Sequence, residues 1–250
     1  MEAYTDFANV YDTFMDETPY EEWCEFLVQI LEEYEVPKGL VLDLGCGTGT
    51  LTEMLSKEGY DMIGVDNSEQ MLAIAMEKRE ISGENILYLL QDMREFELYG
   101  TVGAVISVCD SLNYLLEEDD LLQTFQLVNN YLDPKGIFIF DFNTVYKYRE
   151  VIGDTTIAEN REECSFIWEN YYHEEEEINE YDLTIFVREE DELFRKFEEN
   201  HYQRGYRLKQ MEEALKKAGM EFVKAMDADT HGEVTKNSER IYCIARECGK

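Results

Sequence analysis

The sequence predicts an α/β fold, with helices on both faces of a mostly parallel sheet and an inserted antiparallel β meander. Two observations carry this prediction. Between residues 40 and 143, short aliphatic strands alternate with amphipathic helices, as in parallel sheets whose strands are joined by crossover helices. From Cys164 to about Arg204 the helical periodicity is lost, and aromatic and β-branched stretches are separated by acidic turns, which favours antiparallel strands.

The alternation can be followed element by element through the first part of the chain. Apolar side chains at helical spacing predict a helix over residues 20–35, which Pro37 and Gly39 end. Strands are then expected over residues 40–44, 61–66, 86–92, 104–110 and 137–142. The helices between them are expected over residues 50–59, 69–80 and 121–132, with Ser68 as an N-cap.

The last part of the chain leaves this pattern and then returns to it. The meander is expected to contain strands over residues 164–173, 180–189 and 193–204. A helix over residues 208–219, closed by Gly219, and strands over residues 222–229 and 240–247 follow. We therefore divide the chain into an α/β domain of residues 1–145 and 205–250 and an inserted antiparallel β subdomain of residues 146–204.

The composition limits the classes of function. The chain has 250 residues, no apolar run of the roughly 18 to 20 residues that a membrane span needs, and acids where a signal peptide carries bases. We therefore expect a cytoplasmic protein with no membrane partner. The formal net charge of −34 disfavours a nucleic-acid substrate, because such binding depends on lysine and arginine contacts to phosphate. Six scattered cysteines and three widely separated histidines predict reduced thiols and no metal site.

The stretch VLDLGCGTGT, residues 41–50, places alternating glycines directly after a strand. Such a loop lets a ligand approach the backbone, and phosphate, a dinucleotide and S-adenosylmethionine are the candidates. The phosphate-loop pattern GxxxxGK[ST] is absent, and the dinucleotide pattern GxGxxG has a different spacing. Asp43 is unfavourable beside a pyrophosphate and favourable beside the sulfonium and ammonium groups of S-adenosylmethionine. Asp66 can accept both ribose hydroxyls, which both remaining cofactor classes require.

The motifs DLGCGTGT, VDNSEQML, QDM and CDSLNYL follow one another between residues 41 and 143. Their order resembles that of class I S-adenosylmethionine-dependent methyltransferases. The flanking segments extend the resemblance over nearly the whole chain, to small, mostly uncharacterised bacterial methyltransferases with a domain of the methyltransferase-25 type. The resemblance implies a Rossmann-like methyltransferase fold with a mostly parallel seven-stranded sheet, S-adenosyl-L-methionine as the cofactor, and residues 1–36 as an N-terminal helical lid.

The resemblance also implies roles for individual cofactor-binding residues. The turn under the methionine portion of the cofactor would be formed by Asp43, Gly45, Cys46, Gly47 and Gly49. The ribose and the adenine would be held by Asp66, Asn67, Met71, Asp92 and Met93. Beside the methionine portion would lie Cys109 and Asp110, and the cofactor would be covered by Tyr11.

Four of these assignments keep an alternative. Asp92 could cap a turn, and Met71 could belong only to the core. Tyr11 could be an aromatic staple that holds the N-terminal helix. Cys109 could be a nucleophile, but it has no neighbouring proline and no basic surface, and a buried, inert thiol is the other interpretation.

The methyl acceptor is expected beyond the carboxyl ends of the strands. The motif NPPY, which is typical of enzymes that methylate planar amide or adenine nitrogens, is replaced by DSLNY. This argues against those acceptors, and two tyrosines, an asparagine and several acids at this edge indicate a small polar acceptor that could be cationic. The candidate catalytic residues are Tyr11, Asn113, Tyr114 and His201, and Tyr4 is a further lid residue.

Three functions stay open at this stage. The main hypothesis is S-adenosylmethionine-dependent methyl transfer to a small molecule by in-line displacement at the sulfonium. A non-catalytic protein or partner subunit that binds S-adenosylmethionine or S-adenosylhomocysteine would need the same cofactor residues. An NAD-dependent oxidoreductase would share the ribose-binding acid. The aromatic residues of the meander could form a roof over the site or the contact of a homodimer.

Overall fold

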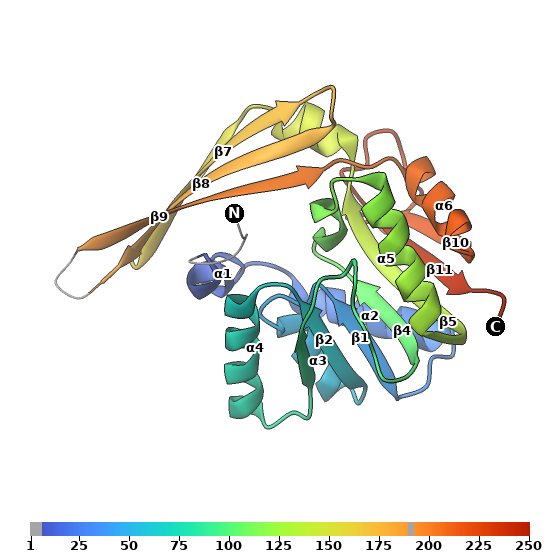
Figure 1. Cartoon of the computed structure of the whole chain (residues 1–250). Helices are drawn as coiled ribbons and strands as arrows, with labels where there is room; N and C mark the ends of the chain where they lie inside the picture. The colour runs from blue at the N-terminus through green and yellow to red at the C-terminus, as the bar shows by residue number, and fades with distance from the viewer. Residues whose placement is uncertain (1–6, 190–192) are drawn as a thin grey trace.

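The computed structural model describes residues 7–189 and 193–250, so Tyr4 lies outside the described residues. Two separate sheets organise the chain (Figure 1), as the sequence predicts. The first has seven strands in the order β10-β11-β5-β4-β1-β2-β3, and β11 is antiparallel to both of its neighbours. Its strands are β1 Leu40–Leu44, β2 Asp61–Asp66, β3 Leu87–Leu90, β4 Val102–Ser107, β5 Leu132–Asn143, β10 Met220–Asp227 and β11 Arg240–Glu247.

Helices cover both faces of this sheet, as expected. They are α1 Ala8–Phe14, α2 Tyr20–Glu33, α3 Thr50–Lys57, α4 Glu69–Ser82, α5 Glu118–Tyr131 and α6 Leu208–Lys217, with a short 3-10 helix η1 at Ser111–Tyr114. The apolar sides of α2, α3 and α4 pack into one core cluster, and those of α5 and α6 pack into a second. The hydroxyl of Ser68 accepts a hydrogen bond from the Met71 amide at 3.2 Å, which confirms the expected N-cap of α4.

The central strands are buried on both faces, which explains their almost continuous apolar sequences. β4 and β5 carry Val105, Phe138 and Phe140, all fully buried. The Phe138 and Phe140 rings stack with centroids 4.6 Å apart. Because β1, β2, β4 and β5 run in parallel, their carboxyl ends lie along one edge of the sheet.

The second sheet is antiparallel, with the order β6-β7-β8-β9. Its strands are β6 Thr156–Asn160, β7 Cys164–His173, β8 Ile178–Arg188 and β9 Phe194–Arg204, preceded by a π-helix η2 at Lys147–Ile152. The sequence predicts three strands in this sheet, and the structure has a fourth, β6, which the prediction missed. β6 reads TIAEN and is mostly exposed, so it lacks the alternation that reveals a half-buried strand.

The inner face of the second sheet packs on the N-terminal helix α1. Val10 shares a cluster of buried residues with Phe166 and Ile185. The Phe14 and Phe166 rings meet edge to face with centroids 4.8 Å apart. In Figure 1 the sheet arches past α1, and α1 lies between it and α4. The meander therefore covers the N-terminal helix.

Two boundaries differ from the expectation. β5 begins at Leu132 directly after α5, and Pro134 lies within the strand, where the pairing with β4 shifts register between Val102 and Ala104. This irregularity tolerates a residue that cannot donate a ladder hydrogen bond. Helix α6 is capped by Ala218, and Gly219 follows it with φ +83°.

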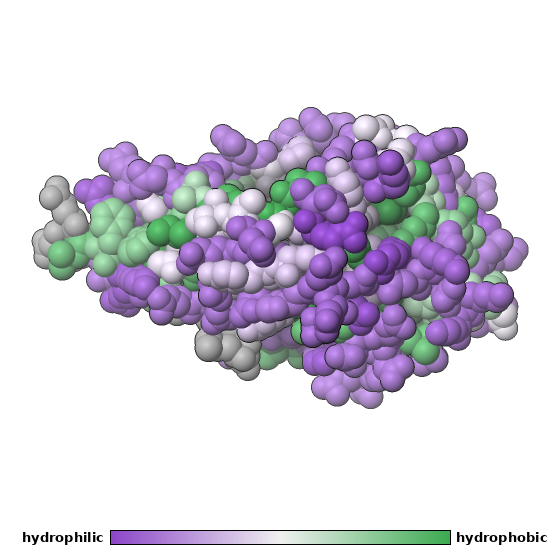
Figure 2. All heavy atoms as spheres, turned by 90° about the horizontal axis from the view of Figure 1, so that it is seen from above, coloured by the Kyte–Doolittle hydropathy of each residue, from purple (hydrophilic) through white to green (hydrophobic). Residues whose placement is uncertain are grey.

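The surface is dominated by polar side chains. Figure 2 shows hydrophilic residues over most of the face seen from above, with smaller groups of hydrophobic residues between them at both ends and in the middle of the view. Among the described residues, no helix combines the length and the apolar character needed to cross a membrane.

Candidate functional site

A cavity lies at the edge of the seven-stranded sheet where the parallel strands end. It is lined by residues from the loops after β1, β2, β3 and β4 and from the N-terminal helices. Of the expected site residues, the lining includes Tyr11, Asp43, Gly45, Cys46, Gly47, Asp66, Asn67, Met71, Asp92, Met93, Cys109 and Tyr114. Four expected residues are not in the lining, namely Gly49, Asp110, Asn113 and His201.

The glycine loop is fastened to β2 through its backbone. The amides of Gly45 and Cys46 both donate to the Val65 carbonyl, at 2.8 and 3.0 Å. A Cβ at Gly49 would overlap the Tyr88 hydroxyl, whereas a Cβ at Gly47 would meet no atom within 4 Å. Both glycines have φ between +53° and +72°, which L side chains rarely adopt. Gly49 therefore serves the packing of the loop, and Gly47 is the position where the backbone is open to a ligand.

Asp66, at the end of β2, is held by backbone donors. Its Oδ2 accepts from the Gly47 amide at 2.8 Å, and its Oδ1 accepts from the Ser68 amide at 2.9 Å. Burial raises the pKa of Asp66 above its usual value, and these amides partly offset the effect. A carboxylate has about four acceptor positions, so Asp66 can still accept a hydrogen bond from the cavity.

Asp43, at the end of β1, is 3% exposed and accepts a 2.6 Å hydrogen bond from the Thr52 hydroxyl. Burial raises its pKa to about 7, and the Thr52 hydroxyl partly offsets this shift. A carboxyl in this state favours a cationic neighbour, because a nearby positive charge stabilises the ionised form.

The residues after β3 form the other end of the lining in the strand order. The Asp92 carboxylate accepts from the Arg94 amide at 2.8 Å and pairs with the Arg94 guanidinium at 2.6 Å, and Arg94 also holds the pKa of Asp92 below its usual value. The turn-capping interpretation of Asp92 therefore has support, and its place in the lining is compatible with both roles. Met71 is 2% exposed and also lines the cavity.

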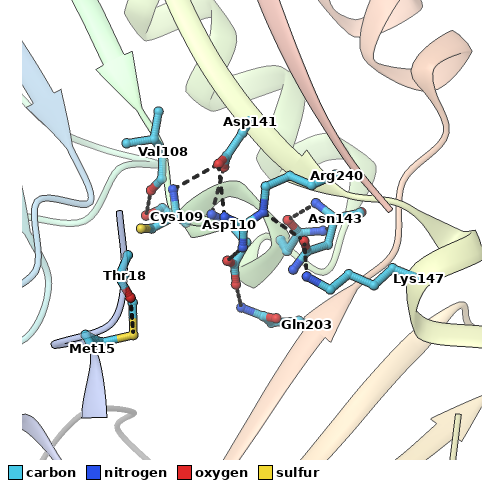
Figure 3. Close-up of polar contacts among 12 residues, drawn as sticks. Met15, Thr18, Val108, Cys109, Asp110, Asp141, Asn143, Lys147, Gln203 and Arg240 are labelled. Atoms are coloured by element: carbon cyan, nitrogen blue, oxygen red, sulfur yellow. Dashed lines mark hydrogen bonds and ion pairs between the residues drawn. The ribbon is translucent and has the colours of Figure 1, made fainter. Parts of the chain in front are cut away.

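The chain after β4 makes a tight turn that a buried acid holds in place (Figure 3). Cys109 and Asp110 have φ of +61° and +53°, a conformation that costs of order 1 to 3 kcal/mol for a residue other than glycine. Their amides donate to the two carboxylate oxygens of Asp141, at 3.1 and 2.8 Å. Burial raises the pKa of the Cys109 thiol well above its usual value. This argues against a thiolate nucleophile.

Asp110 is not part of the cavity lining, and its side chain lies in a polar network (Figure 3). Its carboxylate binds Arg240 at 2.5 Å and accepts from the Gln203 amide group at 2.8 Å. Arg240 also lies 3.6 Å from the fully buried Asp141. The Arg240 guanidinium thus balances the charges of Asp110 and Asp141. Through Arg240 and Gln203, the Asp110 side chain joins the turn after β4 to β11 and β9.

Tyr11 lines the cavity from α1, the helix that carries the expected lid motif. Its ring meets the Phe7 ring edge to face, with centroids 5.6 Å apart, which gives the staple interpretation support as well. The next residue, Asp12, binds Lys78 of α4 at 2.6 Å and accepts from the Thr48 hydroxyl at 2.7 Å. The N-terminal helix is thereby fastened to the glycine loop.

Two of the candidate catalytic residues lie behind the lining. Asn113 is fully buried, donates to the carbonyls of Asn143 and Arg204 at 2.9 and 2.7 Å, and accepts from the Asn143 amide at 2.8 Å. These bonds join the end of β5 to the end of β9, which is a structural task. His201 lies on β9, and its Nδ1 is 3.2 Å from the hydroxyl of Tyr114, which does line the cavity.

Several residues of the site were not found from the sequence. Thr48, Lys78, Gln203 and Arg240 contact site residues over separations of 30 to 130 positions. Arg240 stands in the segment SERIYCIAR, which carries the family resemblance at the C-terminal end, and that was the one available signal. Tyr20 and Ser111 also line the cavity.

The residues present fit S-adenosylmethionine. The backbone at Gly47 is open, as close approach of a ligand requires. Asp43 is buried with a raised pKa, and a sulfonium or ammonium group in the cavity would stabilise its charged form. Asp66 offers two carboxylate oxygens that backbone amides already orient.

Comparison with known proteins gives the same identification. Residues 41–136 match the family described as "Methyltransferase domain". The protein named "Putative methyltransferase YqeM" from Bacillus subtilis (strain 168) is 37% identical over 245 residues, covering 98% of this chain and 97% of the relative. A second protein with a "Putative methyltransferase" name, from Geobacillus sp. (strain WCH70), is 37% identical over 246 residues, covering 98% of this chain and all of the relative.

A solved structure and a relative whose name states a specific reaction are also similar to this chain. The crystal structure of an S-adenosylmethionine-dependent methyltransferase from Clostridium acetobutylicum has a TM-score of 0.89 and 29% identity, covering 99% of this chain and 100% of that one. A Streptomyces venezuelae protein named "dTDP-3-amino-3,4,6-trideoxy-alpha-D-glucopyranose N,N-dimethyltransferase" is 30% identical over 138 residues, 54% of this chain and 56% of the relative. The chain belongs to the S-adenosylmethionine-dependent methyltransferases.

Proposed function

We propose that this enzyme transfers a methyl group from S-adenosylmethionine to a small polar molecule. The observation that carries the proposal is the continuity of one cavity along the sheet edge. Its lining begins with Asp92 after β3, passes Asp66 and the glycine loop, and ends with Tyr114 after β4. A cofactor held at the first three loops leaves the tyrosine side for an acceptor.

Each group of the lining has a task in this proposal. Asp66 holds the ribose, Asp92 and Met93 meet the adenine, and Asp43 with the glycine loop holds the methionine portion. Bound S-adenosylmethionine supplies a methyl group on a positively charged sulfur, which an acceptor attacks in line. Because that methyl group is already activated, orientation supplies much of the acceleration. The strained turn at Cys109 and Asp110, fixed by Asp141, keeps the wall beside the acceptor rigid.

Two observations support a small acceptor. The cavity is bounded by α1 and Tyr20 as well as by the strand ends, so the N-terminal helices add a wall to the site. The Streptomyces venezuelae relative is named for methylation of an amino sugar nucleotide. The net charge of −34 opposes a nucleic-acid partner.

We also propose a cytoplasmic location. Two structural predictions remain to be tested. One is that residues 146–204 form a separate inserted subdomain, and the other is that the second sheet forms a homodimer contact.

The test separates binding from turnover. Purified protein is titrated calorimetrically with S-adenosylmethionine and, in parallel, with NAD⁺, and is then incubated with methyl-labelled S-adenosylmethionine and a library of polar metabolites. We expect binding of S-adenosylmethionine without binding of NAD⁺, and label in at least one product. Binding without a product from any acceptor, in folded protein, would favour the non-catalytic alternative.

A further inference from the structure

We propose that Tyr114, His201 and Glu199 form a proton relay that takes the proton which an ammonium acceptor must lose before it is methylated. This inference rests on the proposed function, because it assigns the chemistry on the acceptor side of the same cavity. Tyr114 would be the group that touches the acceptor. His201 and Glu199 would act through Tyr114 as positioning residues.

The three side chains are aligned in one chain of contacts. The Tyr114 hydroxyl is 3.2 Å from His201 Nδ1, and His201 Nε2 is 3.2 Å from Glu199 Oε2. An ionised carboxylate accepts hydrogen bonds and donates none, so in the relay that we propose, with Glu199 ionised, Nε2 carries the ring proton and Nδ1 accepts from the tyrosine hydroxyl. The order of donor, imidazole and carboxylate matches the arrangement by which a buried acid orients a histidine base.

The contacts between Tyr114, His201 and Glu199 are largely shielded from solvent. His201 and Glu199 are each 4% exposed, and both lie on the inner face of β9. The other oxygen of Glu199 accepts from the Phe7 amide at 2.9 Å, so the start of α1 also helps to fix the carboxylate. Within residues 7–189 and 193–250, titratable groups that face the His201 ring include Tyr114 from η1, Glu199 from β9 and, across the β8–β9 ladder, Tyr181.

The proton transfer balances without another reactant. The acceptor R–NH₃⁺ gives a proton to the Tyr114 oxygen while the Tyr114 proton passes to His201 Nδ1, which leaves R–NH₂, neutral tyrosine and an imidazolium beside the Glu199 carboxylate. The free amine then forms its bond to the methyl carbon as the carbon–sulfur bond breaks, and the sulfur keeps that electron pair. After the product leaves, the imidazolium returns its Nδ1 proton to the Tyr114 oxygen while the Tyr114 proton passes to water in the cavity.

The chemistry of the relay selects an ammonium acceptor over an alcohol. Transfer of a proton from an alkylammonium group to a neutral imidazole exchanges one cation for another, whereas transfer from an alcohol would create two separated charges in a buried site. An alcohol holds its proton far more strongly. Among the described residues, Arg94 is the one lysine or arginine of the lining, and it is already paired with Asp92, so the lining offers no unpaired lysine or arginine to repel an ammonium acceptor.

The first experiment examines the relay without any acceptor. The chain has three histidines, so protein labelled with ¹⁵N-histidine gives few ring signals, and a His201→Gln variant assigns the one of interest. We expect the Nε2–H tautomer at His201 and a changed Nδ1 signal in Tyr114→Phe. His173 is the internal control, because it contacts Glu180 at 2.7 Å on the exposed face of the same sheet. An Nδ1–H tautomer, or a His201 signal that ignores Tyr114→Phe, would overturn the relay.

The second experiment uses the pH dependence of methyl transfer to ethanolamine, glycine and glucosamine as probe acceptors. Loss of the relay by His201→Gln or Tyr114→Phe should lower kcat/KM on the order of 100-fold at pH 7. The defect should shrink to a few-fold at about pH 10, where the amine is already neutral. The matched controls, His173→Gln and Tyr202→Phe, change a histidine and a tyrosine that both contact Glu180 on the outer face and should leave the rate unchanged.

The outcomes separate the two proposals. A defect of equal size at pH 7 and pH 10 would assign His201 a structural role and overturn the relay. In the screen of polar metabolites described above, methylation of alcohols or thiols with no amine methylated would overturn the ammonium assignment. Binding of S-adenosylmethionine with no product from any acceptor would instead contradict the proposed function, while the histidine spectra still report whether Tyr114 and His201 are connected.

Discussion

The cofactor side and the acceptor side of the cavity are assembled in different ways. On the cofactor side, the contacts join neighbouring loops: Asp43 meets Thr52 nine positions away, and Asp66 meets Gly47 19 positions away. On the acceptor side, Tyr114 meets His201 over 87 positions and Asp110 meets Arg240 over 130. The residues on the cofactor side therefore come from neighbouring loops, whereas the acceptor side depends on contacts with the second sheet and the last strand.

The two sides also differ in the groups that hold their residues in place. Backbone amides orient Asp66, and such donors survive most substitutions. Side chains of opposite charge hold the turn after β4, where Arg240 balances Asp110 and Asp141. We therefore expect substitutions on the acceptor side to lower the free energy of unfolding most. Substitutions on the cofactor side should mainly weaken binding of the cofactor.

The largest effect is expected for Arg240→Met. Removing the cation leaves Asp141 and Asp110 without their countercharge, which should lower the free energy of unfolding by about 3 kcal/mol at pH 7. The side chain is 19% exposed, so we use the lower end of the usual range. Arg246→Met on the same strand is the control, and chemical denaturation is the measurement.

The pH dependence of that variant follows from Asp141. Burial raises its folded pKa, and Arg240 opposes the rise, so without Arg240 the folded pKa rises further above the unfolded value. A group of this kind favours the folded state when protonated, and this contribution is lost as the pH rises through the folded pKa. The defect of Arg240→Met should therefore shrink between pH 7 and pH 4, and a constant defect would contradict the assigned charge balance.

The next effect is expected for Asp66→Ala on the cofactor side. Loss of two hydrogen bonds from ribose hydroxyls to a carboxylate should weaken binding of S-adenosylhomocysteine about 100-fold. Asp61→Ala, at the exposed start of β2, should leave the affinity unchanged. Calorimetric titration measures both, and unchanged affinity in a folded Asp66→Ala protein would remove Asp66 from the ribose site.

The two glycines of the loop offer a finer separation. Gly49→Ala places a methyl group on the Tyr88 hydroxyl and should cost about 2 kcal/mol of unfolding free energy. Gly47→Ala points into open space, so it should cost about 1 kcal/mol, from its backbone conformation, and should weaken cofactor binding more than Gly49→Ala does. Thermal denaturation and calorimetry of both variants test this, and the reverse ranking of affinities would place the cofactor elsewhere.

The smallest effect is a pH dependence of cofactor affinity. With a pKa raised to about 7, Asp43 is protonated in the free protein below that pH, and binding of a cationic cofactor must release the proton. The dissociation constant should therefore rise by up to about tenfold for each pH unit below 7. Asp43→Asn should remove this slope between pH 5.5 and 7, and an unchanged slope would assign it to another group.

The sequence was sufficient for the fold class because the buried strands and capped helices are local patterns. It was also sufficient for the residues that line the cofactor side, since Asp43, the glycine loop and Asp66 follow consecutive strands and parallel strands end at the same edge. The relation of these residues to the cavity follows from strand order, and their contacts with the cofactor remain predictions.

The acceptor side could not be predicted in the same way. Asn113 and Asp110 stand at a strand end in the sequence, but the structure turns Asn113 to Asn143 and Arg204 and Asp110 to Arg240. These orientations depend on where β9 and β11 return to the sheet edge. β6 was missed because a short, exposed, polar strand carries no alternation.

A crystal structure of the protein with S-adenosylhomocysteine tests the central claim most directly. We expect the ribose hydroxyls to bind the Asp66 carboxylate and the thioether sulfur to face the side of the cavity that Tyr114 lines. A ligand whose ribose lies away from Asp66, or whose sulfur faces the loop after β3, would contradict the division of the cavity into a cofactor side and an acceptor side.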